Sequence, residues 1–326
     1  MLIRWIGLAI VLAISIHSAL AAHAEAREKL WQIGLLVPGL PPGCGTDARP
    51  AVLLALREGL RELGYVERQN YVFVARCALR EDEKMLSAAR DLVAQNVDVI
   101  MVGSNELARA LKKATTTVPV VFIAVTDPEE EGLVASLARP GANMTGFSHQ
   151  TRELTGKRLQ LLKETLPKLR RVAVLATEKR RDIEREGARL GLQIQHFIAR
   201  QPGELRAAFA AAHVARPEAL LVDPHPMFWF ERRRIVELAS EIGLPAVYEN
   251  ADFVEAGGLM AYGASLADMS RRAAEYIDRI LRGAKPAELP VQQPTKFELV
   301  INLRTAKAIG LTIPQSVLGR ADQVIE

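Results

Sequence analysis

Short apolar runs alternate with amphipathic segments along the first part of the chain. The run 118–125 is apolar throughout, which is typical of a strand buried on both faces. In contrast, 51–63 repeats its apolar residues with helical spacing and stops at Gly64. Strands that alternate with helices favour a parallel sheet with right-handed crossovers. The pattern predicts strands at 33–37, 71–75, 97–102, 118–125 and 145–148, and helices at 51–63, 82–94 and 106–116.

A second run of the same alternation follows, so the fold expected for the whole chain is α/β, with two doubly wound parallel-sheet lobes. This run predicts strands at 171–176, 193–198, 219–222 and 246–248, and helices at 154–166, 182–190, 204–213 and 231–242. The remaining elements are a strand at 259–262, a long amphipathic helix at 266–281, a linker at 283–290, and a closing strand and helix at 297–302 and 303–310.

The length of 326 residues exceeds that of one ordinary hydrophobic core, which also favours two lobes. We expect three hinge crossings between the lobes, near Ser148, near 252–258 and near 289–294. This is the layout of a two-lobed binding protein. The expected first lobe is 27–148 plus about 256–288, and the expected second lobe is 149–255 plus about 289–326.

The N-terminus has the layout of a secretory signal peptide. Arg4 supplies a short positive region, 5–20 is an uncharged apolar run, and small residues in A-x-A spacing continue to Ala26. A retained membrane anchor is the alternative, but the run is shorter than the roughly 20 residues of a spanning helix. We therefore expect 1–26 to be cleaved and the mature protein to be periplasmic. No cysteine lies near the cleavage region, which argues against a lipid anchor.

The two cysteines of the chain, Cys44 and Cys77, follow the first two expected strands. Export would place both in an oxidising compartment. If the two strands are neighbours in a parallel sheet, both cysteines lie at the same edge, and a disulfide between them is geometrically reasonable. Two unpaired thiols are the alternative. The spacing matches no metal motif.

Charge and motif content exclude several classes of function. The formal net charge is +4, and the basic residues are interspersed rather than gathered in a stripe, which argues against nucleic-acid binding. The sequence contains no G-x-S-x-G turn, no P-loop, no H-E-x-x-H and no paired C-x-x-C, and its histidines lack metal-ligand spacing. We therefore expect no enzyme activity, no cofactor and no bound metal.

The C-terminal stretch 289–326, LPVQQPTKFELVINLRTAKAIGLTIPQSVLGRADQVIE, resembles the extracytoplasmic substrate-binding proteins of ABC transporters, in the branch that includes tryptophan- and tyrosine-type binding proteins. The resemblance implies the type I periplasmic binding fold. It also implies a small-molecule ligand, amino acid-like or aromatic, that is captured between the lobes and passed to an ABC permease and its ATPase subunit. We expect the protein to be a monomer.

Ligands of open α/β sheets bind at the carboxyl ends of the strands, so the residues just after each strand are the candidates. Pro38 opens a loop rich in Pro and Gly. Ser104 and Asn105 precede a helix, and either is suited to cap it and to leave its N-terminus available to a ligand carboxylate. Thr126 and Asp127 would accept a ligand ammonium, and the Asp-Pro that follows this strand also resembles a motif of the family. A local turn made by Asp127 is the alternative.

Further candidates lie at the first crossing and in the second lobe. Ser148 is a polar residue at the crossing itself. Thr177 precedes a loop that is shorter than in related sequences, a departure that bears on ligand preference. Asp223 is suited to accept a ligand amine, and Tyr248 to stack on an aromatic ligand unless it is merely packed.

Two other functions stay open at this point. A periplasmic sensor that reports to a signalling receptor would have the same fold and differ only in its partner. An exported α/β enzyme would need a nucleophile or metal constellation that the sequence lacks. The effector domain of a repressor is disfavoured because a signal peptide stands where a helix-turn-helix would be.

Overall fold

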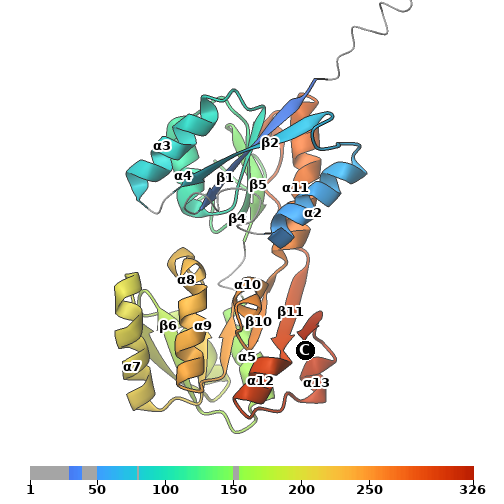
Figure 1. Ribbon diagram of the computed structural model, residues 1–326. Coiled ribbons are helices and arrows are strands. Elements are labelled where there is room, and N and C mark those ends of the chain that lie inside the picture. Colours follow the sequence, from blue (N-terminus) through green and yellow to red (C-terminus); the bar gives the residue numbers. More distant parts are fainter. Residues whose placement is uncertain (1–28, 39–49, 79–80, 150–153) are drawn as a thin grey trace, which may run out of the picture.

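The computed structural model describes residues 29–38, 50–78, 81–149 and 154–326, which form two lobes, each built on one sheet (Figure 1). The expectation of two parallel-sheet lobes in an α/β protein is confirmed. The expected signal peptide, 1–26, lies outside the described residues. Within the described ranges, no helix has the length and apolar character needed to cross a bilayer.

The first lobe contains a parallel sheet in the order β2-β1-β3-β4-β5. The order reverses between β1 and β3, so the connections leave these strands on opposite faces and open a crevice at their carboxyl ends. Helices α2 and α11 share a core with one face of the sheet, and α3 and α4 with the other. The elements are β1 (Trp31–Pro38), α2 (Pro50–Glu62), β2 (Tyr71–Ala78), α3 (Asp82–Val93), β3 (Val99–Val102), α4 (Asn105–Ala114), β4 (Val120–Val125), β5 (Met144–Ser148) and α11 (Leu266–Leu281).

The second lobe contains a sheet in the order β12-β11-β10-β9-β8-β6-β7, parallel except where β11 runs antiparallel to β10. Helices α7 to α10 pack on one face, and α5, α6, α12 and α13 on the other. The strands are β6 (Arg171–Ala176), β7 (Gln193–Ile198), β8 (Ala219–Val222), β9 (Ala246–Tyr248), β10 (Met260–Ala264), β11 (Phe297–Asn302) and β12 (Gln323–Ile325). The helices are α5 (Thr155–Thr165), α6 (Arg181–Arg189), α7 (Leu205–Ala215), α8 (Pro226–Phe230), α9 (Arg232–Glu241), α10 (Ala251–Glu255), α12 (Leu303–Ala308) and α13 (Gln315–Leu318), with 3₁₀ turns at Pro202–Glu204 and Pro286–Glu288.

The structure corrects the expected position of the second crossing. Residues 252–258 do not leave the second lobe, because β10 follows them and pairs with β9 on one side and β11 on the other. The chain crosses after Ala264, where the Ser265 hydroxyl accepts the backbone N–H of Asp268 and caps α11. Helix α11 then buries its apolar face against α2 and the first sheet. Of the segment 256–288 expected in the first lobe, β10 therefore lies in the second.

The first and third crossings run side by side. The backbone N–H of Ser148 donates to the Gln292 carbonyl at 2.8 Å, and the N–H of Gln292 donates to the Gly146 carbonyl at 2.9 Å. These bonds form a parallel bridge between Phe147 and Gln292, which places Gln292 beside the edge strand β5 of the first sheet. At this junction between the lobes, the first and third crossings are therefore hydrogen-bonded to each other.

Candidate functional site

A cleft with a volume of about 740 Å³ lies between the two lobes. The carboxyl ends of β1, β3 and β4 line it from the first lobe. The segments that follow β6, β8 and β9 line it from the second. This is the position that the strand-end rule predicts for a ligand. Neither lobe forms the cleft alone.

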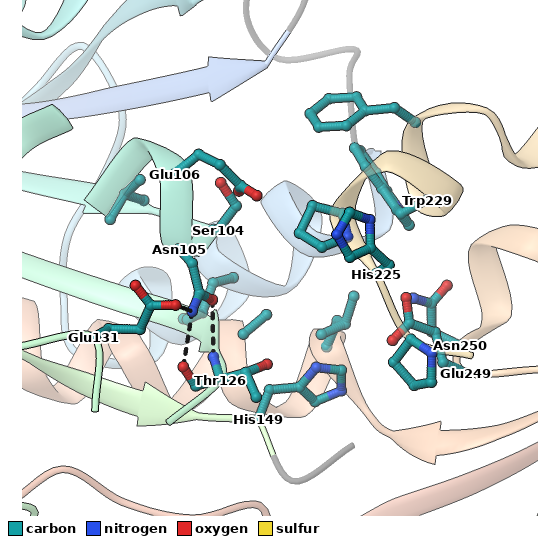
Figure 2. A pocket seen from close by; sticks show the side chains of 18 of the residues that line it. Ser104, Asn105, Glu106, Thr126, Glu131, His149, His225, Trp229, Glu249 and Asn250 are labelled. Carbon is teal, nitrogen blue, oxygen red and sulfur yellow. Dashed lines mark hydrogen bonds between the residues drawn. The ribbon is translucent and has the colours of Figure 1, made fainter. Parts of the chain in front are cut away.

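Ser104 and Asn105 both lie at the cleft, in different roles (Figure 2). Ser104 caps α4, because its Oγ accepts the backbone N–H of Leu107 at 3.3 Å. The Asn105 side chain donates to the Thr126 carbonyl at 2.8 Å and accepts the Thr126 N–H at 2.9 Å. It also donates to Glu131 at 3.0 Å. Asn105 therefore holds the loop after β4, and direct contact of Asn105 with a ligand stays a prediction.

The loop after β4 presents Thr126 and Asp127 to the cleft. Asp127 has a φ of 46°, in the left-handed region that Asp tolerates better than most residues. Its carbonyl accepts the N–H of Glu131 at 2.9 Å, which closes a backbone turn over 127–131 that includes Pro128. The turn and the position at the cleft thus occur together, and acceptance of a ligand ammonium by Asp127 stays a prediction.

Two expected residues do not contribute a described side chain to the cleft. Ser148 is 5% exposed and donates its hydroxyl to the Gln292 carbonyl at 3.4 Å, so it belongs to the hinge. Its neighbour His149 lines the cleft instead, because successive side chains of extended backbone point to opposite sides. Pro38 ends β1, and its side chain lies outside the described residues.

In the second lobe, Thr177 and Asp223 line the cleft as the sequence predicted. Asp223 is already paired, because Arg180 Nη1 lies 3.0 Å from its Oδ2. Burial raises the pKa of the Asp223 carboxyl, and the nearby Arg180 charge opposes that rise. The charge expected to meet a ligand amine is thus compensated within the protein, and an amine contact at Asp223 stays a prediction.

The aromatic wall of the cleft comes from α8, which sequence reasoning missed. Trp229 and Phe230 line the cleft with their rings 5.0 Å apart and inclined at 70°. The Trp229 indole donates its N–H to the Asp252 carboxylate, which fixes the ring. The available signal was the run PMFWF, which follows Asp223 after two residues and brings aromatic side chains to a strand end.

Tyr248 does not line the cleft, which corrects its expected stacking on a ligand. The side chain is 1% exposed and its ring stacks on Phe253 at 4.7 Å and 13°. Burial raises the pKa of its phenol. The next two residues, Glu249 and Asn250, face the cleft instead (Figure 2). At β9 the last strand residue thus belongs to the core, and the residues that line the cleft begin one position later, with Glu249 8% and Asn250 5% exposed.

A buried guanidinium lies behind the cleft lining in the second lobe. Arg158 is fully buried and donates from Nε to the Tyr262 carbonyl at 2.8 Å. Burial lowers its pKa to about 10, and the carboxylates of Glu249 and Asp223 oppose this change. At neutral pH the guanidinium is therefore charged, and it places a positive charge near both carboxylates.

The predicted disulfide falls partly outside the described residues. Cys77 lies in β2 and is disulfide-bonded. Cys44, the other cysteine of the chain, is not among the described residues. Within those ranges, no group of three or more His, Cys, Asp or Glu side chains is arranged to hold a metal ion.

The fold and the cleft define a two-lobed ligand-binding protein. The family model described as ABC transporter substrate binding protein matches residues 45–325. The chain belongs to this family, and its relatives are binding proteins rather than enzymes. A tyrosine-binding protein from Clostridioides difficile is 24% identical over 272 residues, which cover 78% of this chain and 75% of that protein.

Solved structures show the same architecture. The ABC domain in complex with L-Trp from Streptococcus pneumonia has a TM-score of 0.78 and 25% identity, and covers 91% of this chain and 100% of its own. A conserved domain protein from Vibrio cholerae has a TM-score of 0.77 and 27% identity, and the match covers 91% of this chain and 100% of that protein. The ligand-free, open substrate-binding protein CD0873 from Clostridium difficile has a TM-score of 0.67 and 22% identity. The match covers 91% of this chain and 99% of that protein.

Proposed function

We propose that this protein captures an amino acid with an aromatic side chain in the interlobe cleft and delivers it to the permease of an ABC importer. The observation that carries the proposal is the pairing of an aromatic wall, Trp229 and Phe230, with polar strand ends on the facing lobe. An apolar cleft wall with a few placed polar groups is typical of small-molecule sites. Membership of the family and the ligands for which two relatives are named, tyrosine and L-Trp, support the same class.

Capture would follow the hinge geometry. The lobes are connected near Ser148, at Ser265 and near Gln292, and the cleft lies beyond these connections. Rotation about these connections would bring α8 towards α4 without rebuilding either sheet, as in hinge closure around a ligand. The ligand side chain would then be sealed against Trp229, and the closed form would present a new surface to the permease. Export through the predicted signal peptide would place the protein on the side of the membrane where this delivery is needed.

The binding proposal is tested by isothermal titration of the mature protein with each of the common amino acids. Tryptophan, tyrosine or phenylalanine is expected to bind most tightly. Trp229→Leu should then weaken binding by roughly 1–3 kcal/mol, since an aromatic contact and its buried area are lost. Trp31→Leu is a matched control, because Trp31 begins β1, away from the carboxyl end that reaches the cleft. Equal affinity of Trp229→Leu and wild type for the bound amino acid would overturn the assignment.

Delivery is tested separately, in proteoliposomes that contain the permease and ATPase of an ABC importer from the same organism. Addition of the liganded protein should stimulate ATP hydrolysis and uptake of the labelled amino acid. Absence of uptake with a protein that binds its ligand would favour a sensory role.

A further inference from the structure

Carboxylates dominate the charged lining of the cleft. The chain as a whole is basic, with a formal net charge of +4, so this acidic character is local. Among the described residues that line the cleft, the seven carboxylates are those of Glu106, Asp127, Glu130, Glu131, Glu178, Asp223 and Glu249, and the two guanidinium groups are those of Arg109 and Arg180.

Both guanidinium groups are already engaged within the protein. Arg109 Nη1 lies 2.5 Å from a Glu131 oxygen, and Arg180 Nη1 lies 3.0 Å from Asp223. The buried Arg158 supplies a third positive charge, near Glu249 and Asp223. These charges compensate part of the lining, and the cleft keeps a negative excess that favours a positively charged group on the ligand.

Glu106 is distinguished within this set by an unsatisfied oxygen. It occupies the first turn of α4, and its Oε2 is shielded from solvent without a hydrogen-bond partner among the described residues. Figure 2 shows its carboxylate directed from the first lobe into the space that His225 and Trp229 face from the second. A shielded carboxylate oxygen without a donor costs free energy, which a donor brought by the ligand would recover.

We infer that Glu106 accepts the ammonium group of the ligand and makes the cleft selective for aromatic amines and amino acids over aromatic carboxylates that lack the amino group. The inference rests on the proposed function for the aromatic part of the ligand, which would lie against Trp229. The amino group would then project towards α4 on the facing lobe. Ligand binding would link the two lobes through opposite ends of one molecule.

The test compares tryptophan, tryptamine and indole-3-propionate on three proteins by isothermal titration. Wild type should bind indole-3-propionate at least about tenfold more weakly than tryptophan and tryptamine, since indole-3-propionate has no ammonium group for the charge-assisted hydrogen bond. Glu106→Gln should weaken the binding of tryptophan and tryptamine by about tenfold or more. It should not weaken the binding of indole-3-propionate. Glu83→Gln is the matched control, because it removes an exposed carboxylate from the first turn of α3, outside the cleft. It should bind all three compounds as wild type does.

Each other outcome is decisive. Equal affinity of Glu106→Gln and wild type for tryptophan would overturn the role of Glu106. Tight binding of indole-3-propionate by wild type would overturn it too. Either result would leave the proposed function standing. If wild type binds no aromatic amino acid, the proposed function fails, and the Glu106 comparison is made on lysine, arginine and histamine. Failure of every amine to bind would overturn the inference as well. Equal melting temperatures of the two Gln variants show that Glu106→Gln is folded.

Discussion

Arg180 joins two strand-end loops of the second lobe by donating to both carboxylate oxygens of Asp223, at 3.0 and 3.3 Å. The same guanidinium also donates to Asp182 at the start of α6. The short loop after Thr177 is what brings Arg180 so close to β8. The loop between β6 and α6, which the sequence analysis expected to bear on ligand preference, therefore places an ion pair with Asp223 at the cleft.

Arg180→Gln is expected to destabilise the second lobe. Asp223 would keep a carboxylate that is 7% exposed and would lose its guanidinium, while Arg180 itself is only 14% exposed. Removing one partner of a buried pair costs about 3 kcal/mol or more. Urea unfolding of the ligand-free protein measures this cost. The double variant Arg180→Gln/Asp223→Asn should cost less than the sum of the single variants, and simple additivity would contradict the pairing.

Tyr248→Phe is expected to leave ligand affinity unchanged, within about twofold. Its ring packs on Phe253 inside the second lobe and does not reach the cleft. Tyr248→Ala should instead lower the free energy of unfolding by about 3–5 kcal/mol, because it empties a core site. Titration of the bound amino acid together with thermal unfolding separates the two effects. A weaker affinity in Tyr248→Phe would restore the role that the sequence suggested.

His196 is expected to make the second lobe less stable in mild acid. Its side chain is 2% exposed, its Nδ1 lies 3.5 Å from Glu184, and its Nε2 accepts the backbone N–H of Arg180 at 3.2 Å. Burial lowers the pKa of His196, and Glu184 opposes this shift. A base whose pKa is lowered on folding binds more protons when unfolded. Its contribution to stability is therefore present above its unfolded pKa of about 6.5 and is lost as pH falls below it.

The measurement is the urea midpoint of wild type and His196→Gln between pH 7.5 and 5. Gln keeps an acceptor for the N–H of Arg180 and cannot titrate, so the variant should lose less stability than wild type over this range. Parallel curves for the two proteins would show that other groups cause the acid sensitivity.

Gly146→Ala is expected to disturb both β5 and the hinge. Gly146 has a φ of +147°, and a Cβ at this position would lie 1.9 Å from the Phe122 carbonyl oxygen. Its own carbonyl holds Gln292 of the third crossing. We expect a loss of about 3 kcal/mol or more, from a clash with backbone that has no flexible end to move. Thermal unfolding tests this, with Gly203→Ala as control, where a Cβ meets no described atom within 4 Å.

The alternation of strands and helices could be predicted from the sequence because it depends on local periodicity. The apolar run at 118–125 became β4, and the amphipathic stretch at 51–63 became α2. The strand-end rule then located the cleft, since it requires only the order of the elements. Thr126, Asp127 and Asp223 were found in this way, and all three line the cleft.

Three features depended on tertiary structure. Strand β10 lies in the second lobe because β9 and β11 complete its hydrogen bonds, and no local pattern states which edges are free. Tyr248 and Trp229 are both largely buried, at 1% and 8% exposed, but only Trp229 lines the cleft, because that depends on how α8 and α10 pack on the sheet. Arg180 and Asp223 are 43 residues apart in sequence and meet only when β6 and β8 are neighbours. The sequence by itself therefore determined the elements and the edge that carries the cleft. Packing between distant segments decided which side chains reach that cleft and which of their charges are already paired.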